Sequence, residues 1–303
     1  MQALTYYLVR PLLWLLSLLP LWILYGISTG VSWILNHLVR YRRSTVHGNL
    51  KIAFPDKSDR WVKSTADKFY EHFTDTFIEL LKSQTISEAA MRKRFTYTNP
   101  ELLNHYTDQG IDVIMVFGHY ASYEWSNSLQ RHLTGQSLLV YKPLANHLFD
   151  NYIRSIRGKY GSHLVPMADL TSRMAQRDTP QTAYVVGLLC DQLPRRDRVR
   201  YFTKFFDTPT GAFMGPEVLA KKGKSAVIYM DIQRVKRGYY SASFELLTDT
   251  PRETDRYEIT DMFFKRLEKQ IEDAPAYYLW THKRWKTTPD MLPTRPLSPQ
   301  FQT

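Results

Sequence analysis

A chain of 303 residues is long enough for one sizeable core and an accessory segment, and a hydrophobic fraction of 44% with 23% charged residues indicates an ordinary folded protein. The formal net charge of +11 suits nucleic acid, an anionic membrane surface or an acidic partner, and does not by itself choose among them. Cys190 is the only cysteine, which excludes an intrachain disulfide and a cysteine-based metal cluster and fits a reducing compartment.

Residues 1–43 are predicted to form an N-terminal membrane-anchoring helix. No formally charged residue lies between Arg10 and Arg40, and residues 11–35 are mainly Leu, Ile, Trp and Val. Roughly 20 apolar residues are enough to cross the hydrocarbon core of a bilayer. The sequence therefore favours a single spanning helix.

Basic side chains follow this apolar run at once: Arg40, Arg42, Arg43 and Lys51. The positive-inside tendency then places the bulk of the chain on the cytoplasmic side. The alternative is a hydrophobic hairpin, or a helix that lies in the membrane interface, because Pro20, Gly26 and Gly30 would bend a spanning helix.

After residue 43, the spacing of apolar residues changes once, from a helical pattern to an alternation of strands and helices. Residues 44–94 are predicted to be a helical segment, and residues 95–288 an α/β domain in which short apolar runs alternate with helical patterns. This alternation predicts a central, mostly parallel mixed sheet flanked by helices. The predicted strands are 111–117, 137–141, 183–189, 226–233 and 239–247. The predicted helices are 122–132, 146–160, 169–177, 216–222 and 258–271.

Two features mark the end of the domain. The last two strands are joined through Arg237-Gly238 and are expected to pair as an antiparallel hairpin at one edge of the sheet. Residues 289–303 are rich in proline and are expected to form a mobile tail.

A histidine and a glutamate lie five positions apart where the first of these strands ends. Gly118 lets the chain turn after residues 111–117, and Ser122 is expected to cap the next helix. His119 then lies at the carboxyl edge of the sheet, where open α/β sheets bind ligands, and Glu124 lies in the first helical turn. A histidine with a carboxylate partner is a general base whose ring that partner orients. Both residues are candidate catalytic groups; the alternative is that His119 is a capped or core residue.

Other polar or aromatic stretches fall near the same edge. Tyr141-Lys142 ends the second strand, and Arg154 and Arg157 share one face of the helix that follows it. Asp191-Gln192 ends the third strand. Residues 205–217 form an aromatic loop before the next helix. Asp191 is thus placed at the same edge as His119.

In this order, the stretches resemble the late acyltransferases of lipid A biosynthesis, the lauroyl/myristoyl transferase family of the lysophospholipid acyltransferase superfamily. The resemblance covers most of the chain, from the apolar N-terminus to Lys286. Its blocks are Gly118-His119 with Glu124-Trp125, Tyr141-Lys142-Pro143, Arg157 ahead of Tyr160-Gly161, Asp191-Gln192, Phe205-Phe206 to Gly215-Pro216, and residues 278–286. The chain departs from the family pattern at Ser122-Tyr123, His147 and Asp207, which leaves the acceptor open.

The resemblance implies O-acyl transfer from an acyl thioester to a hydroxyl of a lipid A precursor. His119 would take the hydroxyl proton and Glu124 would orient its ring. Arg157, or Arg154 in its place, would stabilise the oxyanion or hold a lipid phosphate. The residues expected to bind substrate are Tyr141, Lys142, Arg154, Asp191, Gln192, Phe206, Gly215 and Arg284. No metal and no cofactor are expected beyond the thioester of acyl carrier protein or coenzyme A as co-substrate.

Other functions stay open at this point. The acceptor could be another membrane lipid, either an aminolipid or a glycosylated phospholipid. A thioesterase and an inactive lipid-binding protein are further alternatives. The expected partners are a membrane lipid acceptor, an acyl carrier protein or acyl-CoA donor and an anionic membrane surface, but not nucleic acid. The expected location is the bacterial inner membrane, with the catalytic domain on its cytoplasmic side.

Overall fold

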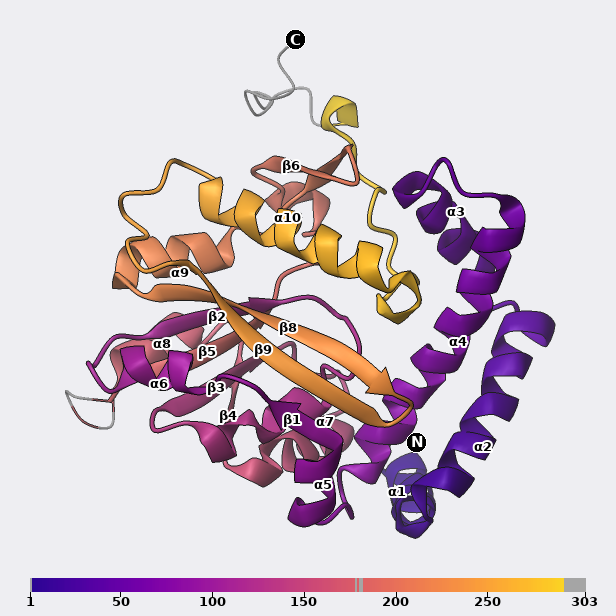
Figure 1. Ribbon diagram of the computed structural model, residues 1–303. Coiled ribbons are helices and arrows are strands. Elements are labelled where there is room, and N and C mark those ends of the chain that lie inside the picture. The colour runs from indigo at the N-terminus through magenta and orange to yellow at the C-terminus, as the bar shows by residue number, and fades with distance from the viewer. Residues whose placement is uncertain (1, 178, 180–181, 292–303) are drawn as a thin grey trace.

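The computed structural model describes residues 2–177, 179 and 182–291. Within them, a seven-stranded sheet forms the centre of the molecule, with the order β1-β9-β8-β2-β5-β3-β4 (Figure 1). Its strands are β1 (Phe95–Tyr97), β2 (Val113–Phe117), β3 (Gln136–Tyr141), β4 (His163–Pro166), β5 (Tyr184–Leu189), β8 (Ala226–Lys236) and β9 (Tyr239–Thr248). Neighbouring strands are parallel except β8 and β9, which pair antiparallel. The predicted α/β fold with a mostly parallel mixed sheet is confirmed.

Helices surround this sheet. They are α1 (Gln2–Leu18), α2 (Leu21–Trp33), α3 (Arg43–Ala53), α4 (Asp59–Lys82), α5 (Glu88–Arg94), α6 (Glu101–Thr107), α7 (His147–Arg157), α8 (Leu170–Ala175), α9 (Gly215–Gly223) and α10 (Glu258–Asp273). A small antiparallel pair, β6 (Phe202–Phe205) and β7 (Thr208–Gly211), lies near α10. Shorter helical turns cover Ile34–Leu38, Trp125–His132, Gly158–Tyr160, Arg196–Arg198, Pro275–Tyr277 and Pro289–Met291.

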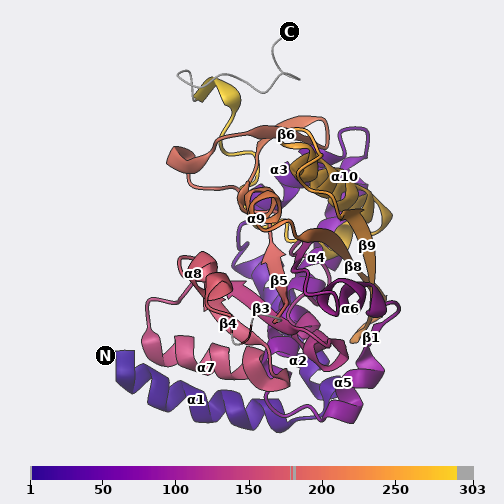
Figure 2. The same ribbon diagram turned by 90° about the vertical axis from the view of Figure 1, so that its left-hand side faces the viewer.

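The central strands are apolar along their whole length because they are covered on both sides. Every residue of β2 is buried, and so is all of β5 except Leu189. Helices α9 and α10 pack against β2 and each other, while α6 packs against β2 and β5 (Figure 2). Parallel strands enclosed in this way read as continuous hydrophobic runs, which is why sequence periodicity located them.

The predicted edge hairpin is only partly right. β8 and β9 do form an antiparallel pair, but β1 adds to β9 and occupies the edge position (Figure 1). β1 has three residues and β4 has four. Strands this short show no measurable alternation of apolar and polar residues, which is why the sequence pattern did not predict them.

The apolar N-terminus is not one continuous helix. α1 ends at Leu18 and α2 begins at Leu21, with Pro20 between them in an extended conformation (φ −56°, ψ 145°). Proline has no N–H to continue the helical ladder, so the run divides there. Among the described residues, none of the helices combines the length and the apolar character that crossing a bilayer requires. The predicted spanning helix is therefore not supported.

The two N-terminal helices instead lie against the rest of the protein. α1 runs beside α7 (Figure 2), and α2 runs beside α4 (Figure 1). Helices α3, α4 and α5 occupy the predicted helical segment 44–94. Of the predicted tail, residues 289–291 form a single helical turn and residues 292–303 lie outside the described part of the chain.

Candidate active site

The strand register brings His119 and Asp191 together. β2 and β5 are parallel neighbours in which Phe117 stands opposite Leu189. His119 and Asp191 each lie two residues beyond these partners, where the two segments have left the sheet, so they occupy equivalent positions at its carboxyl edge. The backbone N–H of His119 and its ring both hydrogen-bond to Asp191, at 3.2 Å to Oδ1 from the backbone and 2.7 Å to Oδ1 from Nδ1. The carboxyl edge of the sheet thus forms a histidine–aspartate pair.

Asp191 fixes the tautomer of the histidine. Its side chain is 2% exposed. Burial alone raises the pKa of Asp191, but the charge and hydrogen bond of His119 and the charge of Arg284 outweigh burial and lower it. The ionised carboxylate only accepts hydrogen bonds, so Nδ1 of His119 carries the proton and Nε2 is left as the basic atom.

The loop that carries His119 is held by the segment after α10. Leu279 N–H donates to the His119 carbonyl (3.1 Å), and Ala121 N–H donates to the Tyr277 carbonyl (3.0 Å). Ala121 has a positive φ of 49°, a conformation that costs energy for any residue with a Cβ and is common at functional sites. Gly118, three residues earlier, packs closely on α10: a Cβ there would lie 2.6 Å from Cδ1 of Leu267, so the Leu267 side chain would have to move.

Glu124 does not orient the His119 ring, which corrects the predicted pairing. Both Glu124 oxygens instead accept hydrogen bonds from Arg157 on α7, at 2.6 Å from Nη2 and 2.9 Å from Nε. The predicted helix cap also differs: the turn Trp125–His132 is a 3₁₀ helix whose N-cap is Glu124, and Ser122 donates its hydroxyl to Glu79. A bidentate carboxylate–guanidinium pair is a rigid unit, so Glu124 positions Arg157.

Two cavities meet at His119. The sheet-edge cavity, about 280 Å³, is lined by His119, Glu124 and Arg157, by Tyr141 and Lys142, and by apolar side chains of β2, β3 and β5. The aromatic cavity, about 210 Å³, is lined mainly by aromatic rings of α4 and of the segment 277–281, and by His119. Tyr123 lines both, and its ring meets the His119 ring edge-on with centroids 5.1 Å apart. The imidazole therefore borders two cavities, and the sheet-edge cavity is the one that also holds Lys142 and the Glu124–Arg157 pair.

The remaining predicted substrate residues are distributed unevenly. The Gln192 amide nitrogen lies 3.3 Å from His119 Nε2. Arg154 is exposed on α7, with its guanidinium 6.0 Å from the centre of the Tyr141 ring. Phe206 packs in an aromatic cluster with Phe54 and Phe205, and Gly215 begins α9. Neither lines the cavities at His119, and their predicted contact with substrate stays a prediction.

Arg284 lies behind the pair rather than in a cavity at His119. It is 1% exposed, donates to the Gly211 carbonyl (3.2 Å), and stands over the Phe264 ring at 4.9 Å. Burial lowers the pKa of Arg284, and the charge of Asp191 acts against that effect. The guanidinium thus serves as a buried counter-charge to Asp191.

Sequence reasoning missed two residues of this network. Tyr278 is buried, and burial together with the charge of Asp191 raises the pKa of its hydroxyl, so that the hydroxyl stays protonated. His282 Nε2 accepts the Leu193 N–H (2.9 Å), and burial lowers the pKa of His282 to about 4. The only sequence signal for either was membership of the terminal block 278–286.

A buried carboxyl group supports the site loop from behind. Glu79 of α4 is fully buried and accepts hydroxyl hydrogen bonds from Ser122 (2.6 Å), Tyr240 (2.7 Å) and Tyr25 (2.9 Å). Its backbone carbonyl accepts from the Trp125 ring nitrogen (2.9 Å). Glu79 therefore joins α2, α4, β9 and the loop after His119 at one point.

We expect Glu79→Gln to flatten the dependence of stability on pH. Burial, opposed by the hydrogen bonds of Ser122 and Tyr240, raises the Glu79 pKa from 4.5 to about 7. Between these values the folded protein holds a proton that the unfolded chain has released, so the free energy of unfolding falls with rising pH, by about 1.4 kcal/mol per pH unit. Chemical denaturation from pH 4.5 to 8 measures this slope. Glu245→Gln, at an exposed carboxylate, is the control. Equal slopes for Glu79→Gln and the unmodified protein would contradict the assignment.

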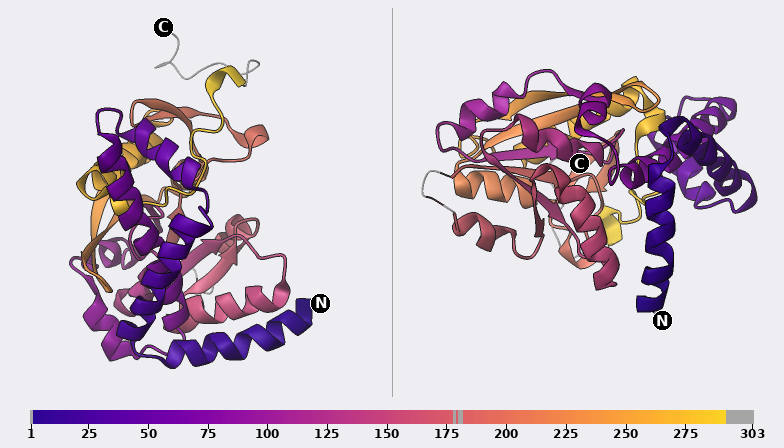
Figure 3. Two further views of the ribbon diagram at one scale, coloured as in Figure 1. Left: turned by 90° about the vertical axis from the view of Figure 1, so that its right-hand side faces the viewer. Right: turned by 90° about the horizontal axis from the view of Figure 1, so that it is seen from below.

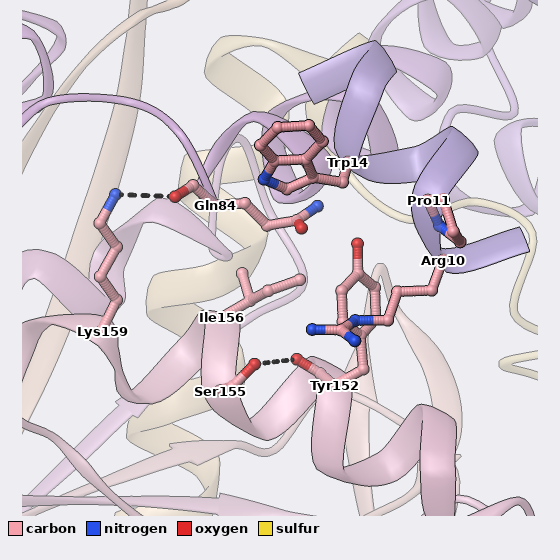
Figure 4. A pocket seen from close by; sticks show the side chains of 8 residues that line it. All are labelled: Arg10, Pro11, Trp14, Gln84, Tyr152, Ser155, Ile156 and Lys159. Atoms are coloured by element: carbon pink, nitrogen blue, oxygen red, sulfur yellow. Dashed lines mark hydrogen bonds between the residues drawn. The ribbon is translucent and has the colours of Figure 1, made fainter. Parts of the chain in front are cut away.

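A further cavity, between α1 and α7, lies apart from the histidine (Figure 4). It measures about 560 Å³ and its lining includes Arg10, Trp14, Tyr152 and Lys159. Lys159 is occupied with carbonyls beyond α4, including Ser83 (2.9 Å) and Ile86 (2.6 Å). No histidine or carboxylate belongs to the described lining, so this cavity lacks a general base. Nor do three His, Cys, Asp or Glu side chains gather to hold a metal anywhere in the described residues.

An open α/β sheet with a histidine–aspartate pair at the carboxyl ends of two central strands, bordered by two cavities, is an arrangement in which a histidine can act as a general base toward a hydroxyl or water. The family model for bacterial lipid A biosynthesis acyltransferases matches residues 1–287. The chain belongs to that family and is an acyltransferase.

Curated relatives agree with this assignment. The chain is similar to the lipid A biosynthesis lauroyltransferase of Escherichia coli K12, with 23% identity over 93% of this chain and 92% of the relative. It is 22% identical to the lipid A biosynthesis palmitoleoyltransferase of the same organism, over 91% and 89% of the two chains. A lipid A biosynthesis acyltransferase of Haemophilus influenzae is 26% identical over 90% and 87%. The similarity therefore extends over nearly the whole length of each protein.

Proposed function

We propose that this protein transfers a fatty acyl chain from an acyl thioester to a hydroxyl of a lipid A precursor, with His119 as the general base. The observation that carries the proposal is His119 itself, whose ring is bonded to Asp191 through Nδ1 and borders both cavities. The family and the names of the relatives support the substrate class. The donor is the thioester of acyl carrier protein or coenzyme A, either of which is acidic and suits the net charge of +11.

The proton and bond changes follow from the geometry. The acceptor hydroxyl loses its proton to Nε2 of His119 while its oxygen attacks the thioester carbonyl, and Asp191 stabilises the imidazolium that forms. The carbon–sulfur bond then breaks, and the leaving thiolate takes the proton back from Nε2. Arg157, held by Glu124 in the sheet-edge cavity, and Lys142 supply positive charge for the oxyanion between these steps.

The Gln192 amide occupies the place that the acceptor hydroxyl needs. It lies 3.3 Å from Nε2, the atom to which the hydroxyl must donate. We infer that Gln192 caps Nε2 before the acceptor binds and swings away when it does. This motion involves an exposed side chain and costs little.

The decisive experiment is a reconstituted reaction. Purified protein is incubated with a lipid A precursor and acyl thioesters in mixed micelles, and the products are identified by mass spectrometry. We expect the precursor to gain one acyl group. Release of free fatty acid with no acylated lipid would instead show a thioesterase, and transfer only to an aminolipid or a glycosylated phospholipid would reject the acceptor. No reaction of any kind would leave a lipid-binding protein.

We propose further that the enzyme works at the bacterial inner membrane, on its cytoplasmic side, with α1 and α2 lying on the bilayer. Large apolar side chains of these helices and of the turn after them are exposed: Leu8 62%, Leu12 60%, Trp22 75% and Leu38 65%. Basic residues follow at 40, 42 and 43. α1 and α2 lie on the outside of the molecule (Figure 3). Exposed apolar side chains followed by cations are typical of helices that bind in the membrane interface.

Acidic substitutions on this apolar face are expected to release the protein from membranes. Leu12→Glu with Trp22→Glu should weaken binding to phosphatidylethanolamine–phosphatidylglycerol vesicles by at least about tenfold, since both side chains would otherwise enter the interface. Co-sedimentation measures the bound fraction. Val218→Glu, which alters a residue of α9 that is 58% exposed, is the matched control. Unchanged binding of the double variant would exclude this face as the membrane contact.

A further inference from the structure

A second charged chamber opens beside the active site. This basic cleft measures about 580 Å³, and five cationic side chains line it: Arg42, Arg195, Arg196, Lys283 and Lys286. No aspartate or glutamate belongs to its described lining. A concave surface that gathers five positive charges raises the local concentration of anions strongly.

The five cations come from three separate parts of the chain, and backbone contacts hold two of them in place. Arg42 stands before α3 and donates to the Thr281 carbonyl (3.0 Å). Arg196, in the loop after β5, donates to the Met291 carbonyl (2.6 Å). These bonds fix the guanidinium groups without cancelling their charge. Within the described part of the chain, Arg195 is the one of the five that contacts a carboxylate, that of the exposed Asp197, at 3.3 Å.

The cleft is continuous with the catalytic network. His282 lines it and accepts the N–H of Leu193, another lining residue. Leu193 follows Gln192, whose amide contacts His119 Nε2. A residue in the wall of the basic cleft is thus the direct chain neighbour of the residue whose side chain covers His119 Nε2.

The basic cleft also borders the aromatic cavity. Tyr41 lines the aromatic cavity and Arg42 the basic cleft; likewise Thr281 lines the first and His282 the second. Val39, just ahead in the chain, is an exposed apolar residue. The cleft therefore lies where the apolar surface of the N-terminal helices gives way to charge, which is the level of lipid headgroups at a membrane.

We propose that the basic cleft binds a phosphomonoester on the acceptor lipid while an apolar part of the same molecule enters the aromatic cavity and its hydroxyl meets His119. The inference rests on the proposed function and names a binding subsite for its acceptor. Arginine and lysine together suit a phosphate, since the guanidinium groups bind it in two-point contacts and the ammonium groups add charge. The thioester donor is left to the sheet-edge cavity.

The test removes two exposed lysines of the cleft. Lys283→Ala with Lys286→Ala is compared with Lys265→Ala and Lys269→Ala, which removes two exposed lysines from α10 and lowers the net charge equally. The Michaelis constant is measured for a lipid A precursor, for the same lipid after phosphatase treatment, and for the thioester. We expect the cleft variant to raise the constant for the phosphorylated acceptor about tenfold and to change the other two less than about twofold. The control should change none of them.

Two other outcomes of this kinetic test would overturn the proposal. A rise for the thioester alone would assign the cleft to the donor's phosphate, and an equal rise for both acceptor forms would mean nonspecific attraction; either overturns the proposal. A binding measurement that needs no turnover separates this inference from the proposed function. Unmodified protein should bind dioctanoyl phosphatidic acid more tightly than dioctanoylglycerol, and the cleft variant should lose that preference. If the protein prefers phosphatidic acid but transfers no acyl group, the cleft assignment stands and the proposed function is rejected. If it transfers the acyl group but shows no such preference, the proposed function stands and the cleft assignment is rejected.

Discussion

Replacing His119 with alanine is expected to lower acyl transfer by at least ~10²-fold, the usual contribution of a positioned general base. The residue sits where both cavities open, and of its two ring nitrogens Nδ1 is bonded to Asp191. Without the imidazole, the acceptor hydroxyl has to lose its proton to solvent. The loss should fall on kcat more than on KM, because the ring acts in the transition state.

The controls for this variant are direct. His105→Ala changes an exposed histidine of α6 and should leave the rate unchanged. Far-ultraviolet circular dichroism and the unfolding midpoint establish that His119→Ala is folded, and vesicle co-sedimentation that it still binds membranes. A purified His119→Ala protein with undiminished kcat would end the general-base mechanism.

Replacing Asp191 with asparagine is expected to cost kcat about 10²-fold as well, through a different route. The amide can still accept a hydrogen bond from Nδ1, but it brings no negative charge to stabilise the imidazolium. It can also turn its NH₂ group toward the ring and reverse the tautomer, which would place the proton on Nε2. Asp191 is therefore a positioning residue whose effect passes through His119.

Two readouts distinguish this role from simple packing. The ring N–H proton of His119 should give a downfield nuclear magnetic resonance signal in the unmodified protein, and Asp191→Asn should remove it, since the 2.7 Å bond to a carboxylate is lost. Asp261→Asn, at a carboxylate that accepts from Tyr201 and Thr203, is a control for removing a hydrogen-bonded aspartate elsewhere. An Asp191→Asn protein that keeps both the signal and the rate would show that another group orients the ring.

Asp191→Asn should also affect stability, because Arg284 behind it would keep a buried charge with its counter-charge removed. In the unmodified protein the Asp191 pKa is lowered below its ordinary value of 3.8, despite burial, by His119 and Arg284. Because the carboxyl pKa is lower in the folded protein, ionised Asp191 adds to the free energy of unfolding at pH values above the pKa of the unfolded chain. That contribution is lost as the pH falls through 3.8 and below. The variant should therefore unfold more easily at neutral pH and show less additional loss on acidification.

Local sequence alone determined the parts of this protein that depend on neighbours in the chain. Continuous apolar runs identified the central strands, since strands buried on both faces need apolar residues at every position. The helix predicted over 146–160 begins where the pattern placed it, with Asn146 as the N-cap of α7. The position of His119, just after a buried strand, followed from the same local pattern, and so did the placing of Asp191 at that edge.

Only the tertiary structure decided which groups touch. Asp191 is 72 residues from His119 in sequence and becomes its partner because β2 and β5 pair in parallel with matched ends. Glu124, five residues away, is drawn to Arg157 of α7, since a bidentate ion pair satisfies both of its oxygens. The apolar N-terminus reads as one span, yet Pro20 divides it into two helices; α4 packs against both, and α7 also contacts α1. Strand order, side-chain partners and helix docking are long-range choices among competing contacts, and the residues next to each group in the chain do not encode them.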